Sequence, residues 1–221
     1  MRKKLQKFQD NAARDNVIEE GKPLYTTIKE RWRPDYFHNN HDITLELGCG
    51  YGEYTVQLAA LLPTHNYIGV DLKGARLWKG STIALNQKLS NVAFLRARIE
   101  QLGQFFGTGE VQKIYIPFPD PRPKKGDINK RLTSPSFLDI YRRILQPEGW
   151  IYFKTDDLDL FLYTLEVLQE QPDVKEILHT RDFYQEKHLV MANGDIQTKY
   201  EAKFINQGKT IKYIQCQLGV A

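Results

Sequence analysis

Short apolar runs alternate with longer amphipathic segments along most of this 221-residue chain. Apolar runs bounded by glycine, proline or asparagine predict buried strands, and segments whose apolar residues recur at helical spacing predict helices. The predicted strands are residues 43–47, 67–70, 92–95, 114–116, 150–154, 174–179 and 210–217. The predicted helices are residues 24–33, 53–62, 73–88, 99–106, 135–145 and 158–169, the first of which ends before Pro34 within an aromatic-rich segment over residues 24–37.

The alternation of strand and helix predicts parallel strand pairing through right-handed crossovers. The predicted fold class is therefore α/β, with a mostly parallel twisted sheet and helices on both faces. No repeat, linker or low-complexity tract divides the chain, so we expect residues 1–221 to form a single domain. Residues 1–20 are polar and basic without an apolar period, which predicts a flexible N-terminal arm.

A glycine-rich turn follows the predicted strand 43–47. The turn reads Glu46-Leu47-Gly48-Cys49-Gly50-Tyr51-Gly52. Asp71 stands 19 residues after the last of these glycines, at the end of the next strand, and an acid at about this offset meets ribose hydroxyls in nucleotide-binding sheets. The dinucleotide fingerprint fails, because Glu53 occupies the place of its third glycine. The pattern favours a nucleoside cofactor site over a purely structural turn.

Composition narrows the class of protein. Hydrophobic residues make up 41% of the chain and charged residues 26%, as in ordinary globular domains. No apolar run approaches the ~20 residues of a membrane helix and the N-terminus has no apolar signal core, so we predict a cytoplasmic protein without a membrane partner. The two cysteines and five histidines show no metal-ligand spacing, so no metal site is predicted.

The net charge of +4 is modest, but the charge is unevenly distributed. One basic run lies in residues 2–14, and a second lies in residues 117–132, within the long loop after the predicted strand 114–116. In a parallel sheet, ligands gather outside the carboxyl ends of the strands. The second run is therefore expected at the mouth of the cofactor site, where its lysines and arginines suit RNA phosphates.

Three further motifs follow the glycine turn in a fixed order. They are Phe118-Pro119-Asp120-Pro121-Arg122-Pro123-Lys124-Lys125, then Thr155-Asp156, then Thr198-Lys199-Tyr200-Glu201. Together with the glycine turn, this order resembles the bacterial tRNA (guanine-N7)-methyltransferases, the TrmB family, over residues 43–216. The resemblance implies a Rossmann-like methyltransferase fold, S-adenosylmethionine as cofactor and tRNA as partner. It also implies methyl transfer to N7 of a guanosine in the variable loop.

The resemblance assigns roles residue by residue. The expected cofactor-binding residues are Glu46, Gly48, Gly50, Gly52, Asp71, Arg98 and Asp120. The expected substrate-binding residues are Lys124, Asp156, Thr198, Lys199, Tyr200 and Glu201. Asp120 is the expected catalytic residue, between the cofactor and the target base.

Three departures from the family pattern affect these roles. Arg122 stands where the family has tryptophan, so stacking there would fall to a guanidinium plane. Residues 126–129 replace the usual Arg-His pair, which reduces the positive charge. Arg98 stands at the position of an acid, with Glu100 two residues later, so a side-chain contact to the adenine end of the cofactor would differ.

The chemistry of the expected target agrees with the residues present. Guanine N7 carries a free lone pair, and its methylation releases no proton from that atom, so no strong general base is required. Two alternatives stay open: a methyltransferase of a small molecule or a protein, and a non-catalytic RNA-binding relative. Either a monomer or a homodimer is compatible with the sequence.

Overall fold

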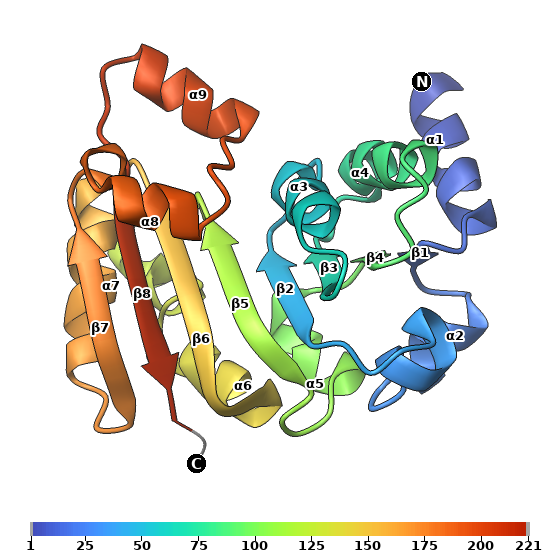
Figure 1. Ribbon diagram of the computed structural model, residues 1–221, viewed down its shortest axis with the longest axis horizontal. Helices are drawn as coiled ribbons and strands as arrows, with labels where there is room; N and C mark the ends of the chain where they lie inside the picture. Colours follow the sequence, from blue (N-terminus) through green and yellow to red (C-terminus); the bar gives the residue numbers. More distant parts are fainter. Residues whose placement is uncertain (1, 220–221) are drawn as a thin grey trace.

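Eight strands form one sheet in the computed structural model, which describes residues 2–219 (Figure 1). Along the sheet the order is β1-β4-β3-β2-β5-β6-β8-β7. The strands are β1 (Val17–Ile18), β2 (Ile43–Leu47), β3 (Asn66–Val70), β4 (Val92–Leu95), β5 (Val111–Pro117), β6 (Leu145–Thr155), β7 (Val174–Thr180) and β8 (Lys212–Leu218).

The helical segments are α1 (Arg2–Ala13), α2 (Pro23–Thr27), η1 (Trp32–Phe37), α3 (Glu53–Leu61), α4 (Gly74–Asn86), η2 (Ile99–Gln101), α5 (Leu102–Phe105), η3 (Lys125–Lys130), α6 (Pro135–Ile144), α7 (Leu158–Gln169), η4 (Phe183–Gln185), α8 (Lys187–Ala192) and α9 (Lys199–Asn206). Within residues 2–219, no helix combines the length and apolar character that crossing a membrane requires.

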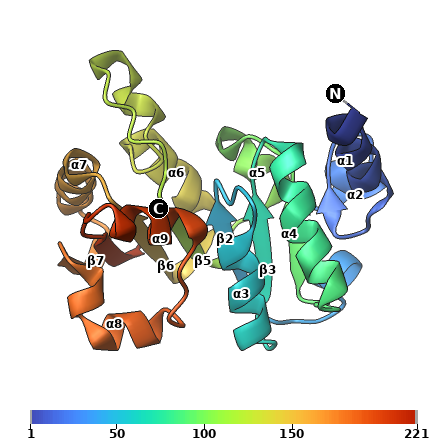
Figure 2. The same cartoon turned by 90° about the horizontal axis from the view of Figure 1, so that it is seen from above.

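Helices cover both faces of the sheet (Figure 2). On one face, α3 and α4 bury a core that includes Leu77 and the Phe94 ring of β4. On the other face, α5, α6 and α7 bury Leu138 and Phe161 in a larger core together with Ile114 of β5. The strands from β1 to β6 pair in parallel. The predicted fold class, a mostly parallel α/β sheet with helices on both faces, is confirmed.

The last strand is the antiparallel member of this mostly parallel sheet. β8 runs antiparallel to both of its neighbours, β6 and β7. The connecting residues 181–211 form η4, α8 and α9 at the edge of the sheet where β7 ends, and they do not cross to the other edge (Figure 1). Because β8 begins at the edge where β7 ends, it must run in the opposite direction.

The helix predicted from residue 24 to Arg33, ending before Pro34, is wrong in its extent. The structure has the short α2, a break, and then the π-helical turn η1. Glu30 lies in the break with a φ of 63°, and its backbone N–H donates to Glu110 Oε2 at 3.0 Å. The break turns Trp32 into the core, where the fully buried indole donates to the Phe105 carbonyl at 2.8 Å. Burial of this side chain outweighs the local helix propensity.

Within residues 1–20, the segment expected to be a flexible arm, residues 2–13 form α1. This helix lies beside α4 (Figure 1). Asn11 is fully buried between the two helices and donates to the Gly74 carbonyl at 2.8 Å. Contacts with α4, which is distant in the sequence, hold this segment in place. The local pattern of apolar residues in the segment therefore did not predict a helix. Met1 lies outside the described residues.

Two glycines let α3 and α4 approach β4 closely. A Cβ atom on Gly52 would overlap the Phe94 ring, and one on Gly80 would lie 2.7 Å from Phe94 Cζ. Phe94 is fully buried and fills the space that both glycines leave. Gly52 also precedes α3 with a φ of 67°, so a larger residue there would be strained as well as crowded.

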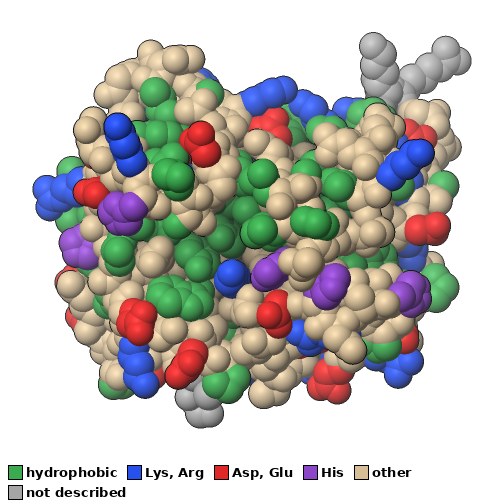
Figure 3. Space-filling model, viewed as in Figure 1, with side chains coloured by type: hydrophobic (Ala, Val, Ile, Leu, Met, Phe, Trp, Pro, Cys, Tyr) green, Lys and Arg blue, Asp and Glu red, His purple; other side chains and the backbone are tan. Residues whose placement is uncertain are grey.

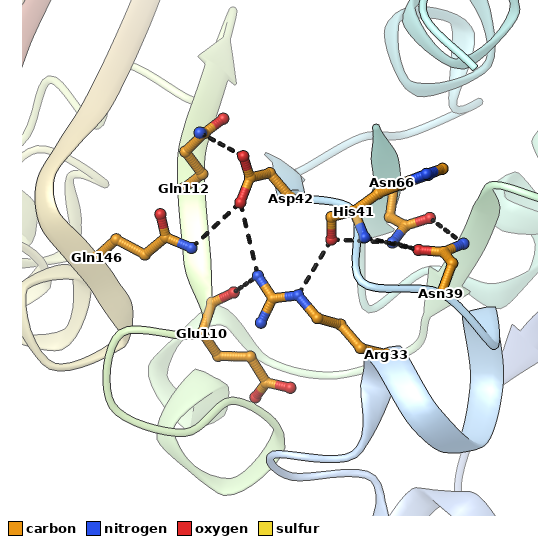
Figure 4. Close-up of polar contacts among 8 residues, drawn as sticks. All are labelled: Arg33, Asn39, His41, Asp42, Asn66, Glu110, Gln112 and Gln146. Atoms are coloured by element: carbon orange, nitrogen blue, oxygen red, sulfur yellow. Dashed lines mark hydrogen bonds and ion pairs between the residues drawn. The ribbon is translucent and has the colours of Figure 1, made fainter. Parts of the chain in front are cut away.

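The amino ends of the parallel strands form the edge of the sheet opposite to their carboxyl ends, and we call it the opposite edge. A polar network lies there (Figure 4). Asp42 accepts a hydrogen bond from Gln112 at 2.6 Å and pairs with Arg33 at 3.8 Å. Asn66 is fully buried and exchanges amide hydrogen bonds with Asn39 at 2.8 and 3.2 Å. Side chains from separate elements therefore satisfy one another here and join the elements together.

Candidate active site

The carboxyl ends of the parallel strands form the edge that we call the site edge, and Figure 2 looks down on this edge. Two adjoining cavities lie there. The inner cavity has a volume of about 250 Å³ and the outer groove about 460 Å³. The residues that line both are Gly48, Arg76, Phe118, Pro119 and Asp120. A ligand that extends from one cavity to the other therefore contacts both the glycine turn and the loop after β5.

The outer groove presents a fixed carboxylate. Asp71 follows β3 directly and is 9% exposed. Its two oxygens accept hydrogen bonds from the backbone N–H groups of Gly50 at 2.9 Å and Lys73 at 2.7 Å. The bond from Gly50 connects the glycine turn to the end of the next strand. Arg98 and Glu100 line the same groove.

The three glycines of the turn have different roles. Gly48 and Gly50 line the inner cavity and adopt left-handed φ values of 68° and 55°. A Cβ atom on Gly48 would meet no protein atom within 4 Å, so the backbone is open to a ligand at this point. Gly52 lines neither cavity. The space beside the Gly52 Cα is filled by Phe94, so this glycine serves helix packing, and its expected cofactor contact stays a prediction.

Glu46 lines the inner cavity and is 5% exposed. Its Oε2 accepts hydrogen bonds from the backbone N–H of Thr55 at 2.7 Å and from the Thr55 hydroxyl. Burial raises the pKa of Glu46 to about 8; the bonds from Thr55 oppose this rise, and the carboxylates of Glu53 and Asp71 add to it. A cation that enters the inner cavity would lower this pKa and favour the ionised form.

The loop after β5 places Asp120 at the junction of the two cavities. The Asp120 side chain is 66% exposed and lies 3.4 Å from the Arg122 guanidinium. Phe118 and Arg122 have left-handed φ values of 52° and 48°, which residues other than glycine seldom adopt. The Phe118 N–H donates to the Lys154 carbonyl at 2.8 Å, which fixes the start of the loop. Strain of this kind is characteristic of functional loops.

The basic residues of this loop divide into exposed and buried cations. Lys124 and Lys125 are exposed and line neither cavity, whereas Lys130 lines the outer groove. Arg131 is only 9% exposed, and its guanidinium donates to the Pro121 carbonyl at 3.1 Å. The Arg131 guanidinium therefore fastens the loop, and a contact between Arg131 and an RNA phosphate stays a prediction.

Residues from the end of β6 and the start of α9 line the inner cavity on another side. Asp156 lines the cavity and pairs with Lys209. The N-cap of α7 is the neighbouring Asp157, so Asp156 is free of that role. Thr198 and Tyr200 line the cavity as well, and Tyr200 is 45% exposed. Three of the predicted substrate-binding residues thus meet at one cavity.

Glu201 has a structural role instead. Its side chain is fully buried, forms a capping box with Thr198 and pairs with the buried Lys154 at 3.3 Å. Burial lowers the pKa of Lys154, whose ammonium lies 3.9 Å from the centroid of the Phe183 ring. The Glu201 side chain has no exposed surface, and its expected substrate contact stays a prediction. The pair holds the cavity wall formed by α9 against β6.

The α4 side of the cavities contains residues that sequence reasoning missed. Arg76 lines both cavities, and Tyr51, which is 37% exposed, lines the inner one. Arg76 lies five residues after Asp71 in the sequence, in the first turn of α4. This short spacing could have indicated that Arg76 lies beside the cavities. Lys199 lines neither cavity; its side chain is 73% exposed, and its ammonium lies 3.7 Å from Glu53.

The remaining reactive groups indicate which chemistry the site offers. Cys49 lines the inner cavity, but burial raises the pKa of its thiol well above the usual value and keeps it protonated. Within the part of the chain that the structure describes, no group of three His, Cys, Asp or Glu side chains is arranged to hold a metal ion. The cavities present carboxylates, the glycine-turn backbone and aromatic rings together with the cations Arg76, Arg98 and Lys130.

Comparisons with known proteins agree with this geometry. A family model described as "Putative methyltransferase" matches residues 40–214. The chain is 45% identical over 215 residues to the tRNA (guanine-N(7)-)-methyltransferase of Cytophaga hutchinsonii, and the alignment covers 97% of this chain and 96% of that one. It is 40% identical over 220 residues to the protein of the same name from Christiangramia forsetii, with 97% of each chain covered.

Solved structures of other methyltransferases share the fold. The 16S rRNA methyltransferase KamB superposes with a TM-score of 0.60 at 16% identity, over 92% of this chain and 99% of that one. An antibiotic-related methyltransferase superposes with a TM-score of 0.60 at 18% identity, over 85% of this chain and 92% of that one. At these identities the likeness establishes the fold alone.

Proposed function

The chain belongs to the family of tRNA (guanine-N7)-methyltransferases, and we propose that it transfers a methyl group from S-adenosylmethionine to N7 of a guanosine in tRNA. The observation that carries this proposal is the position of Asp120, an exposed carboxylate at the junction of two cavities. The identity of 45% over nearly the whole chain supports the same reaction.

The residues at the site edge fit S-adenosylmethionine. Asp71 offers a fixed carboxylate suited to ribose hydroxyls, and the open backbone at Gly48 allows close approach. Arg98 lines the outer groove, where it would contact the nucleoside part. Glu46 would favour the positive charge of the cofactor in its ionised form. The cofactor supplies an electrophilic methyl group on a sulfonium.

Asp120 is the residue that we assign to catalysis. Attack by the N7 lone pair places positive charge on the purine, and a carboxylate that accepts hydrogen bonds from guanine N1–H and the exocyclic amine stabilises this charge. The same bonds orient the base, which lowers the entropic part of the barrier. Since Arg122 lies 3.4 Å from Asp120, its guanidinium would shift as the base binds.

The base must leave its stack to reach the inner cavity. Tyr200 and Thr198, on the cavity wall, are placed to contact an extruded base, and the exposed Lys124 is placed to contact a phosphate. Asp156 lines the same cavity. We assign the target to the variable loop, as the family resemblance implies, since an unpaired base costs less free energy to extrude. A tRNA substrate places the reaction in the cytoplasm.

Transfer of tritium from labelled S-adenosylmethionine tests the proposed function. We expect label in tRNA that lacks modifications, and none in bulk protein or in an extract of small molecules. Label in protein or in small molecules alone would identify a methyltransferase of another substrate. Binding of tRNA with no methyl transfer, and with no heat on titration of S-adenosylmethionine, would identify a non-catalytic RNA-binding protein.

A further inference from the structure

Four cations from three helices gather on the α4 side of the cavities. They are Lys7 of α1, Arg76 and Lys79 of α4, and Lys199 of α9, and we call them the α4 rim cluster. Figure 3 shows Lys and Arg side chains at the top of the molecule, between the positions of α9 and α4. The loop cations Lys124 and Lys130 lie instead on the segment after β5.

Tyr51 connects two of these cations to the inner cavity. Its ring lines the cavity and lies 6.0 Å from the Arg76 guanidinium carbon and 5.2 Å from the Lys79 ammonium. Contacts of this kind between a cation and an aromatic face are attractive. The two charged groups are therefore held beside the cavity mouth, where a substrate would pass.

Lys79 and Lys199 lie close together although both are positively charged. The approach of Lys199 lowers the pKa of Lys79 below the usual lysine value, and Lys7 acts in the same direction. Glu53 offsets part of this charge, since it accepts a hydrogen bond from the Lys199 N–H at 2.8 Å and lies 3.7 Å from its ammonium. Because Glu53 offsets only part of the charge of the four cations in the cluster, the surface keeps an excess of positive charge that an anion would stabilise.

We propose that the α4 rim cluster binds the phosphodiester backbone of the tRNA substrate beside the target guanosine. This inference rests on the proposed function and extends it. Two neighbouring phosphates, one bound to Lys79 and one to Lys199, would relieve the repulsion between these lysines, and lysines contact phosphates as point charges without reading the bases. With Lys124 on the other segment, the backbone would cross the cavity mouth and hold the extruded base above Asp120.

Salt dependence of tRNA binding tests this inference. The double variant Lys79→Gln/Lys199→Gln is compared with the wild type and with Lys175→Gln, a matched control whose lysine is exposed on the edge strand β7. Each phosphate that is no longer neutralised removes roughly 0.7–0.9 from the slope of log Kd against log salt, so the double variant should lose roughly 1.4–1.8. The KM for tRNA should rise, while the affinity for S-adenosylhomocysteine stays within twofold. The control should keep the wild-type slope.

The charge-conserving variant Lys79→Arg should retain the wild-type slope. An unchanged slope in a folded double variant overturns the inference. If the double variant does not fold, the single variant Lys79→Gln decides: a slope reduced by roughly 0.7–0.9 supports the inference, and an unchanged slope overturns it. Failure of the wild type to methylate tRNA would instead overturn the proposed function, so the two failures are distinguishable.

Discussion

The two edges of the sheet use their polar groups differently. At the opposite edge, Asp42 and Asn66 bind side chains from other elements, so the fold itself satisfies them (Figure 4). At the site edge, Asp71 is held by backbone N–H groups and still lines the outer groove, and Asp120 is mostly exposed. Groups of the first kind contribute to stability, and groups of the second kind are available to a ligand.

The difference follows from the direction of the strands. Parallel strands direct their carboxyl ends and the following turns to one edge, and that edge is where ligands bind in such sheets. The turns there adopt left-handed backbone at Gly48, Gly50, Phe118 and Arg122. Stability is thus concentrated at one edge and binding capacity at the other, and substitutions can separate the two.

The buried pair Lys154–Glu201 is an exception at the site edge, and the largest effect on stability is expected there. Glu201→Ala leaves a buried ammonium unpaired, which costs about 3–5 kcal/mol of unfolding free energy. Urea unfolding measures this loss. The matched control is Glu166→Ala, since Glu166 is an exposed acid on α7. A loss as small as that of the control would mean that Glu201 is not a structural residue.

Substitution of Asp120 should affect catalysis and leave stability unchanged. Asp120→Asn keeps the shape of the side chain but removes its charge, and removal of one preorganised stabilising group lowers kcat by about 10²–10³-fold. The unfolding free energy should stay within about 0.5 kcal/mol of the wild type, as for other surface sites. Asp127→Asn in the same loop is the control. Wild-type kcat in the Asp120 variant would remove this residue from the mechanism.

Substitution of Asn66 at the opposite edge should lower stability and leave catalysis unchanged. Asn66→Ala removes the hydrogen bonds that this buried amide makes with the Asn39 side chain and the His41 carbonyl, which costs about 1–3 kcal/mol. The kcat and KM of the folded enzyme should not change. Asn86→Ala, at an exposed asparagine of α4, serves as the control. A large fall in kcat without a loss of stability would contradict the division between the two edges.

Substitution of Glu46 should have a smaller effect on stability, and this effect depends on pH. Its pKa of about 8 in the folded protein exceeds the usual 4.5, so the fold holds a proton that the unfolded chain releases. Stability is therefore lost as pH rises from about 4.5 to 8. Between pH 6 and pH 8, the unfolding free energy of the wild type should fall by about 1–2 kcal/mol relative to that of Glu46→Gln, in which the side chain cannot ionise.

Urea unfolding of both proteins at the two pH values measures the predicted loss. Saturating S-adenosylmethionine should reduce it, because a cation favours the ionised carboxyl. A constant difference between wild type and Glu46→Gln would mean that Glu46 is ionised in the fold.

The sequence predicted those parts of the site that depend on local order. The glycine turn, Asp71 and the loop with Asp120 could be placed because strand ends and helix starts fix them at one edge. Burial of charged residues could not be predicted in the same way. Arg131 and Glu201 look like surface residues in the sequence, but carbonyls and a lysine that are distant in the chain surround them.

The fold shows the same limit. Most strands and helices were predicted from apolar periodicity, yet the direction of β8 depends on where the segment before it ends in space. The helix α1 likewise depends on its contacts with α4. Long-range packing decided these features, and a local pattern contains no information about it.

Nucleoside mass mapping of tRNA tests the central claim most directly. Unmodified tRNA is incubated with the purified protein and S-adenosylmethionine, digested, and the modified nucleosides are identified and located. The account predicts 7-methylguanosine as the product with the wild type, located in the variable loop, and its loss with Asp120→Asn. A methyl group on another atom or another base, or an equal yield with Asp120→Asn, would contradict it.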